Sequence, residues 1–200
     1  MDVIGNQVPR SGGAMRSRIA RGLLNLFGWR TAVALPDVPK MVILAAPHTS
    51  NWDGLFAVLT IFALNLKLNL FAKHSLFRWP FGGFMRWCGM LPVDRRAAGG
   101  LVAQTTAAFA EHPGLLIGIA PEGTRTRNAN WKSGFWQIAR TANVPIVCAY
   151  LDYEQKICGI GPVFMPSESF EADLEKIQVF YRTVKPHSPE NFATPHDGAG

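Results

Sequence analysis

Short apolar runs alternate with longer apolar or amphipathic segments over most of the chain after residue 36. The short runs predict strands at residues 41–46, 68–72, 91–94, 115–120 and 145–151, with one or two more near 156–164. The longer segments predict helices at residues 55–66, 81–88, 101–111, 135–141 and 169–178. Regular alternation of strand and helix is typical of crossover units. The pattern therefore predicts an α/β fold in which helices flank a mostly parallel central sheet.

An amphipathic helix is predicted before this alternation begins. Residues 15–27 place an apolar stripe on one face, made of Met15, Ile19, Leu23, Leu26 and Phe27. The opposite face is polar and basic, with Arg18, Arg21 and Asn25. A basic amphipathic helix often lies in the headgroup layer of a membrane, although an ordinary surface helix packed on the domain has the same pattern.

The predicted elements divide the chain into three parts. We expect a tail and the basic amphipathic helix in residues 1–35, with residues 1–13 frayed because they are polar and rich in glycine. A single α/β domain is expected in residues 36–184, followed by a second tail in residues 185–200. With 200 residues, 48% of them hydrophobic and 17% charged, the chain can bury the core of one domain.

Positive charge is concentrated in two stretches of the chain. Five arginines and no acidic residue lie between Asp2 and Asp37, and only basic residues carry charge between Glu122 and Asp152. This distribution indicates an anionic partner, such as a phospholipid, a phosphorylated substrate or nucleic acid. Nucleic acid is not expected, since no recognisable nucleic-acid-binding motif accompanies the charge.

Cysteine spacing and hydrophobic length argue against two other classes of protein. Cys88, Cys148 and Cys158 form no CxxC pair and no cluster with histidine, so neither a metal site nor a disulfide framework is predicted. The longest nearly uninterrupted apolar run, residues 55–66, is shorter than the roughly 20 residues that span a bilayer, and no signal peptide is evident. We therefore expect a peripheral protein on the cytoplasmic face of the inner membrane.

The first of three segments with candidate chemistry follows the predicted strand at residues 41–46. His48 can take up a proton near neutral pH. Asp53, five residues later across a turn, can fold back onto the imidazole and stabilise the imidazolium. The alternative is structural: Asp53 or Asn51 caps the following helix, and His48 is a turn residue.

The other two segments are basic and also lie next to predicted strands. In residues 121–125, Gly123 allows a sharp bend, so that the Thr124 hydroxyl and the Arg125 guanidinium can face one bound anion. A surface turn with an ion pair is the alternative. In the stretch from Lys73 to Arg96, basic residues bracket a helix and a strand, and they either reach one phosphate or form a solvated face.

Together the segments resemble the lysophosphatidic-acid and glycerol-phosphate acyltransferases. That family has a His-x4-Asp motif, a glycine-rich stretch that ends in Asp-Arg, a Pro-Glu-Gly-Thr-Arg motif and a later Val-Pro-Ile segment, in this order. The chain has the same order: His48 and Asp53, then Gly89 with Asp94 and Arg95, then residues 121–125, then Val144, Pro145 and Ile146. The segment from Lys132 to Phe135 matches a basic, glycine-containing segment that follows the third motif. The resemblance covers about residues 40–165.

The resemblance implies a role for most of the matching residues. His48 is the expected general base that deprotonates the acceptor hydroxyl, and Asp53 is its expected orienting partner. The expected acceptor and phosphate site consists of Arg95, Glu122, Gly123, Thr124 and Arg125. Lys73 and Lys132 are candidate contacts to the donor or to a phosphate. Val144, Pro145 and Ile146 are expected to line the acyl site.

The sequence thus predicts an O-acyltransferase that works at a membrane surface. Acyl-CoA or acyl carrier protein is the expected co-substrate, with no bound cofactor or metal, and a lysophospholipid or a related hydroxyl compound is the expected acceptor. Two alternatives stay open. One is an acyl thioesterase in which His48 activates water, and the other is a non-catalytic module that binds lipid or acyl carrier protein.

Overall fold

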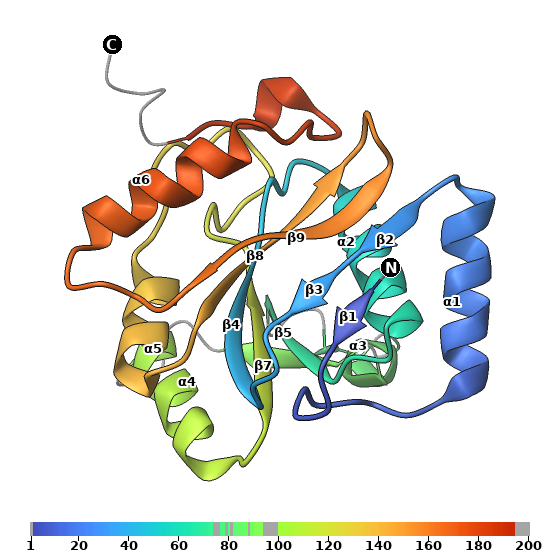
Figure 1. Cartoon of the computed structure of the whole chain (residues 1–200), viewed down its shortest axis with the longest axis horizontal. Coiled ribbons are helices and arrows are strands. Elements are labelled where there is room, and N and C mark those ends of the chain that lie inside the picture. The colour runs from blue at the N-terminus through green and yellow to red at the C-terminus, as the bar shows by residue number, and fades with distance from the viewer. Residues whose placement is uncertain are drawn as a thin grey trace.

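A central sheet with helices on both sides forms the body of the protein (Figure 1). The computed structural model describes residues 2–73, 77–78, 80, 82–87, 89–93 and 100–194, and of residues 71–73 and 90–93 the main chain. In chain order the helices and strands of this part are β1 (Val3–Ile4), α1 (Ala14–Leu26), β2 (Arg30–Ala32), β3 (Ala34–Leu35), β4 (Lys40–Ala45), α2 (Asn51–Ala63), β5 (Leu68–Lys73), α3 (Gly82–Trp87), β6 (Met90–Val93), α4 (Gly100–Glu111), β7 (Leu115–Ile119), α5 (Gly134–Ala142), β8 (Ile146–Asp152), β9 (Ile157–Phe164), α6 (Phe170–Tyr181) and a short 3-10 helix (Pro189–Asn191).

Seven strands form the large sheet within the described residues, in the order β2-β9-β8-β4-β7-β5-β6, and β1 pairs with β3 beside it. Neighbouring strands of the large sheet are parallel except β8 and β9, which are antiparallel. This sheet confirms the predicted α/β class. Each strand and helix predicted between residues 41 and 178 has a counterpart in the structure, with shifted ends.

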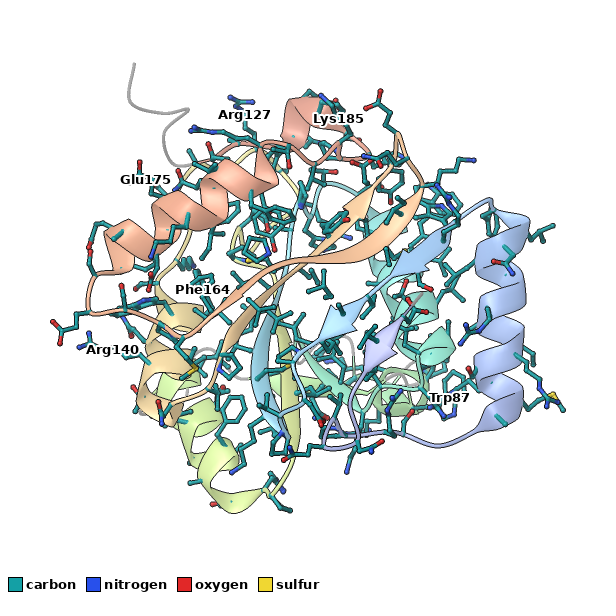
Figure 2. All side chains as sticks on the ribbon, viewed as in Figure 1. Trp87, Arg127, Arg140, Phe164, Glu175 and Lys185 are labelled. Carbon is teal, nitrogen blue, oxygen red and sulfur yellow. The ribbon has the colours of Figure 1, made fainter. Side chains whose placement is uncertain are left out.

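The central strand β4 shows why the strands are continuous apolar runs in the sequence. Met41 and Ile43 pack on one face of the sheet in a cluster with α1 and α2, whereas Val42 and Leu44 pack on the other face in a cluster with α4, α5 and α6. All four are buried, and side chains fill the space between the sheet and the helices (Figure 2). Because helices cover both faces, neighbouring positions of the strand are equally apolar.

Helix α1 packs on α2 through a stripe that differs from its predicted apolar face. Its buried residues are Ala20 and Leu24. Ser17 Oγ and Arg21 Nη2 donate hydrogen bonds to the Ala63 carbonyl near the end of α2, at 2.7 and 2.9 Å. The predicted apolar stripe remains exposed, with exposed fractions of 69% for Met15, 57% for Ile19, 38% for Leu23, 77% for Leu26 and 44% for Phe27. The helix therefore does not pack as an ordinary surface helix, whose apolar face meets the domain.

The N-terminal segment is packed, which corrects the expectation that residues 1–13 are frayed. β1 pairs with β3 in parallel register, and Val8 is buried. The Arg10 guanidinium donates to the Leu64 carbonyl at 2.8 Å. These partners are remote in sequence, so the polar composition of the segment gave no sign of them.

The C-terminal segment is also packed, so the expectation of a tail is wrong for residues 185–194. The Tyr153 amide donates to the Lys185 carbonyl at 2.9 Å, and the Trp131 indole donates to the Ala193 carbonyl at 3.1 Å. In the part of the chain that the structure describes, no helix combines the length and the apolar character needed to cross a bilayer.

Candidate active site

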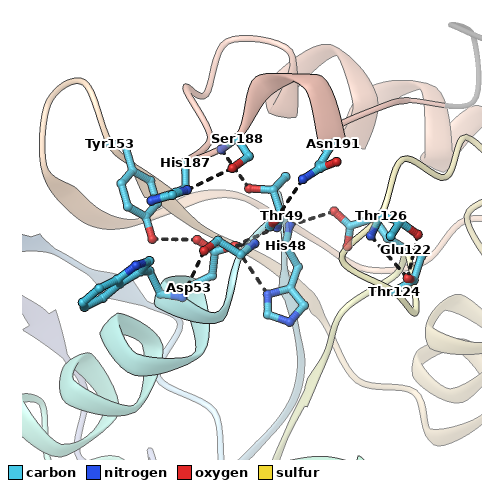
Figure 3. Close-up of polar contacts among 12 residues, drawn as sticks. His48, Thr49, Asp53, Glu122, Thr124, Thr126, Tyr153, His187, Ser188 and Asn191 are labelled. Atoms are coloured by element: carbon cyan, nitrogen blue, oxygen red, sulfur yellow. Dashed lines mark hydrogen bonds and ion pairs between the residues drawn. The ribbon is translucent and has the colours of Figure 1, made fainter.

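Three adjacent strands bring distant segments of the chain to one edge of the sheet. β4 is parallel to its neighbours β7 and β8. The loops that follow Ala45, Ile119 and Asp152 therefore lie at the same edge, where ligands of parallel sheets gather. These loops, the start of α2 and the C-terminal segment carry the polar residues of the site (Figure 3).

The loop after β4 leads directly into α2, and Asp53 lies in the first turn of this helix. Ser50 is the N-cap, and Asp53 completes a capping box because its Oδ2 accepts from the Ser50 amide at 2.8 Å. The same oxygen accepts from the Thr49 amide at 2.7 Å and lies 3.6 Å from Nδ1 of His48. Asp53 therefore supports the helix start and also faces the imidazole. Neither Asp53 nor Asn51 is the N-cap.

The Asp53 carboxylate is charged although it is 3% exposed. Burial by itself would raise its pKa, but contacts from His48, Tyr153 and the amides of Ser50 and Thr49 outweigh burial and lower the pKa below its ordinary value. An ionised Asp53 next to Nδ1 favours the tautomer of His48 in which Nε2 is free to accept a proton.

Glu122 connects the Pro-Glu-Gly-Thr-Arg segment to the histidine. Its Oε1 accepts from the His48 amide at 3.0 Å. Its Oε2 is buried and has no hydrogen-bond partner among the described residues. Burial raises the pKa of Glu122 to about 7, because the hydrogen bond from His48 offsets the cost of burying a charge only in part. Glu122 is thus close to the midpoint of its titration at neutral pH.

The loop that carries Glu122 is braced by its own side chains. Gly123 has a φ of 66°, which confirms the sharp bend predicted there. The Asn128 side-chain amide donates to the Glu122 carbonyl at 2.7 Å. The hydroxyls of Thr124 and Thr126 lie 3.0 Å apart, so Thr124 also has a local partner.

A cavity of about 1180 Å³ opens beside these residues. His48, Asp53, Arg125 and Lys132 belong to its polar lining. Its apolar lining comes from both sides of the sheet, and includes Ile43, Val58, Ile61, Leu64, Leu151, Ile160, Leu101, Val102, Phe135 and Ile138. One cavity therefore joins a histidine, two cations and a long apolar surface. Among the described residues, no three His, Cys, Asp or Glu side chains are grouped so that they could hold a metal ion.

Two further segments reach this edge of the sheet, and no motif pointed to them. The Tyr153 hydroxyl, directly after β8, donates to Oδ1 of Asp53 at 2.6 Å. From the C-terminal segment, the Ser188 amide donates to the Thr49 hydroxyl at 3.2 Å, and the Asn191 side chain donates to the Thr49 carbonyl at 3.5 Å. The signal available in the sequence was a tyrosine at the end of a predicted strand, which by itself has no functional meaning.

A family model described as Acyltransferase matches residues 33–152. The chain belongs to the acyltransferase family. This confirms the family predicted from the four motifs. Among curated proteins, the 1-acyl-sn-glycerol-3-phosphate acyltransferase of Streptococcus pneumoniae is 29% identical over 137 residues, which are 64% of this chain and 50% of that protein. The chain spans about half the length of this relative.

A solved structure supports the same fold for this acyltransferase-family chain. The crystal structure of the 1-acyl-sn-glycerophosphate (LPA) acyltransferase PlsC from Thermotoga maritima matches with a TM-score of 0.60 and 15% sequence identity, over 84% of this chain and 76% of that one. At this identity the likeness shows the fold. Tyr153 and residues 185–194 lie outside the stretch that the family model matches.

The structure brings together most of the residues assigned from the family resemblance. Those that line the cavity are His48, Asp53, Gly123, Thr124, Arg125 and Lys132. Glu122 lies directly behind His48, as its hydrogen bond shows. Lys73 ends β5, and its side chain is not among those described. Arg95 lies outside the described residues.

The structure places Val144, Pro145 and Ile146, which the resemblance assigns to the acyl site, away from the cavity. The three are not among the described residues that line the cavity. β8 begins at Ile146 and reaches the site at its other end, Asp152, so these residues lie at the opposite edge of the sheet. Val144 and Ile146 are buried in the cluster with α5 and α6, and their role is in the core.

Proposed function

We propose that this chain moves a fatty acyl group from a thioester donor to the hydroxyl group of a lysophospholipid, with His48 as general base. The observation that carries the proposal is the position of His48. Its Nδ1 faces the buried Asp53 carboxylate at 3.6 Å, and its side chain, 30% exposed, belongs to the lining of the cavity. A base placed between an orienting carboxylate and the substrate is well suited to general-base catalysis.

The reaction needs one proton transfer in each direction. Nε2 of His48 accepts the proton of the acceptor hydroxyl while the hydroxyl oxygen attacks the carbonyl carbon of the thioester. The C–S bond then breaks, the imidazolium returns the proton to the departing thiolate, and an ester and a free thiol are formed. Asp53 stabilises the imidazolium between the two transfers. A base of this kind typically contributes roughly 10²–10⁴-fold to the rate, and positioning of the substrates contributes much of the rest.

The acceptor site is assigned to the loop after β7. Arg125 and Lys132 line the same cavity as His48 and are suited to the phosphate of a lysophospholipid. Thr124 adds a hydroxyl to this lining. Glu122, which the resemblance assigns to the acceptor site, supports it from behind the cavity, because its Oε1 accepts a hydrogen bond from the His48 amide. Lys73 and Arg95, which are basic residues of the third segment, remain predicted phosphate contacts.

The donor is assigned to the apolar part of the cavity. An acyl chain is long, flexible and apolar, and the lining between α2 and the sheet offers such a surface at Val58, Ile61 and Leu64. The thioester is supplied by acyl-CoA or by acyl carrier protein, each of which carries phosphate that suits the basic lining at Arg125 and Lys132. In this proposal the donor is a co-substrate, and no resident cofactor is needed.

A membrane surface is the proposed source of the acceptor. The exposed apolar stripe of α1 continues to the start of α2, where Trp52 and Leu55 are 48% and 43% exposed. Phe56 links the two helices, since its ring centroid lies 5.8 Å from that of Phe27 and 6.2 Å from that of Trp52. We call this surface, made of Met15, Ile19, Leu23, Leu26, Phe27, Trp52 and Leu55, the apolar face. It begins within one helical turn of the His48 loop, so a lipid held in the bilayer would be close to the site.

Thiol release from palmitoyl-CoA and from palmitoyl-acyl carrier protein tests the proposal. Each donor is incubated with the protein in detergent, without acceptor, with lysophosphatidic acid, and with monoacylglycerol as the matched acceptor that lacks phosphate. We expect release that depends on acceptor, is faster with lysophosphatidic acid, and yields phosphatidic acid. Release without acceptor would indicate a thioesterase. Donor binding without any release would indicate a binding module, and either result would refute acyl transfer.

A further inference from the structure

The Asp53 carboxylate has a partner on each of its two oxygens. Oδ2 faces His48 and accepts the amides of Thr49 and Ser50. Oδ1 points away from His48 and accepts the hydroxyl of Tyr153 at 2.6 Å, a distance typical of a hydrogen bond to a charged oxygen. The carboxylate is therefore fixed from both sides, and the tyrosine hydroxyl supplies the contact opposite the imidazole (Figure 3).

Tyr153 is itself held in place by neighbours from three parts of the chain. Its ring makes edge-to-face contacts with Trp29 at 4.8 Å, with His187 at 5.0 Å and with Phe56 at 6.1 Å between centroids. Its amide donates to the Lys185 carbonyl at 2.9 Å. A ring confined in this way presents its hydroxyl to Asp53 without having to be ordered when substrate binds.

The protonation of Tyr153 suits the role of a permanent donor. Burial, followed by the hydrogen bond to Asp53 and the negative charge of that carboxylate, raises the pKa of the Tyr153 hydroxyl well above its ordinary value. The hydroxyl therefore keeps its proton over the working pH range. Asp53 is among the described residues that line the cavity, and Tyr153 is not. Tyr153 therefore acts on the reaction through its hydrogen bond to the Asp53 carboxylate and does not touch the substrate.

We propose that Tyr153 is a positioning residue of the His48–Asp53 pair, and that it sets both the orientation of the Asp53 carboxylate and the share of its charge that faces the imidazole. The expected effect of Tyr153 on the reaction rate rests on the proposed function. The expected effect of Tyr153 on the titration of His48 does not depend on any substrate. The residue lies just beyond the stretch that the acyltransferase family model matches.

The direction of the effect follows from the geometry. The hydroxyl draws negative charge toward Oδ1, so its removal leaves more charge on the oxygen that faces His48 and stabilises the imidazolium. The other ionisable groups around the pair are Glu122 behind His48, His187 against the tyrosine ring, and Arg125 and Lys132 in the cavity lining. All four are unchanged when Tyr153 is replaced by phenylalanine, so a change in titration reports the loss of the hydroxyl.

The test compares Tyr153→Phe with Tyr181→Phe as the matched control. Tyr181 is also a buried tyrosine that donates from its hydroxyl, but to the carbonyls of Leu44 and Ala149. For Tyr153→Phe we expect kcat about tenfold lower, both KM values within about twofold of the wild-type values, and an acidic limb of the kcat/KM profile at higher pH. For Tyr181→Phe we expect a lower Tm and an unchanged pH profile.

An NMR titration of the His48 imidazole in the same variants separates this inference from the proposed function. In Tyr153→Phe the midpoint of the His48 titration should move to higher pH, and in Tyr181→Phe it should stay in place. If the midpoint moves although no acyl transfer is detected with any acceptor, the positioning role stands and the proposed function fails. If neither the midpoint nor kcat changes in Tyr153→Phe, the tyrosine only packs and the inference is overturned.

Discussion

Two carboxylates lie beside His48, and their surroundings give them different charges. Asp53 takes hydrogen bonds from Tyr153 and from two backbone amides, and its pKa is lowered. Glu122 Oε1 accepts a hydrogen bond from the His48 amide, and its buried Oε2 has no hydrogen-bond partner among the described residues. Opposite shifts in neighbouring carboxyl groups are the usual way in which a site divides its acid–base roles. Asp53 is suited to be the permanent charge, whereas Glu122 holds the His48 loop through the His48 amide and changes its own charge near neutral pH.

Glu122 also makes stability depend on pH. Its pKa is about 7 in the folded protein against an ordinary value of 4.5, so the folded state binds the proton more tightly. Proton binding by Glu122 therefore adds to the free energy of unfolding. This contribution is fully present below pH 4.5 and is lost as the pH rises through about 7. Relative to Glu122→Gln, the wild-type free energy of unfolding should therefore fall over this range, by on the order of 2–3 kcal/mol. Urea unfolding of both proteins between pH 4.5 and 8 measures the difference, and parallel pH curves would contradict it.

The residues of the site that were predicted are close together along the chain. His48 and Asp53 are separated by one turn, and Glu122 and Arg125 belong to one short loop. Spacing and residue type left a structural alternative for each pair, and the order of the motifs in the family resemblance assigned their roles. Tyr153 contacts Asp53 from 100 residues away, and such a contact has no spacing to reveal it. The position of Val144 in the core follows from the direction of β8, because the first residues of a parallel strand lie at the edge opposite the site.

Among the elements, α1 was predicted as a helix from hydrophobic periodicity, but the periodicity did not predict which face of the helix packs on the domain. α2 is apolar on nearly all sides, so more than one face of α1 could pack against it. In the structure Ala20 and Leu24 are the residues of α1 that are buried. Arg16 and Arg21, two of the five arginines between Asp2 and Asp37, donate hydrogen bonds to the carbonyls of Gly12 and Ala63. The more apolar stripe of α1 is therefore exposed, and we propose that it contacts another partner.

Replacement of Ile19 and Leu26 by Gln tests whether that partner is a membrane. Both residues are exposed, 57% and 77%, so the change should leave Tm unaltered. Co-sedimentation with vesicles of anionic phospholipid should fall about tenfold or more, because two apolar side chains no longer enter the interface. Val179→Gln, at a valine 58% exposed on α6, is the control. Equal binding of the double variant and wild type would show that the stripe is not a membrane contact.

At the scale of the whole molecule, the order of strands explains how one site draws on the full length of the chain. β7, β4 and β8 are neighbours, and the loops that follow them supply Glu122, the His48–Asp53 pair and Tyr153. Alternation of strands and helices predicted the sheet but not its order, nor the pairing of β1 with β3. Strands of two residues are too short to show periodicity. The C-terminal segment is held by hydrogen bonds with Thr49 and Trp131, which are remote in sequence.

Transfer of labelled palmitate from palmitoyl-CoA to lysophosphatidic acid by wild type, His48→Ala and His112→Ala tests whether His48 is the general base. His112 is an exposed histidine just after α4 and serves as the matched control. We expect a rate roughly 10²–10⁴-fold lower for His48→Ala with an unchanged Tm, and a wild-type rate for His112→Ala. Transfer by His48→Ala at the wild-type rate would show that the base lies elsewhere.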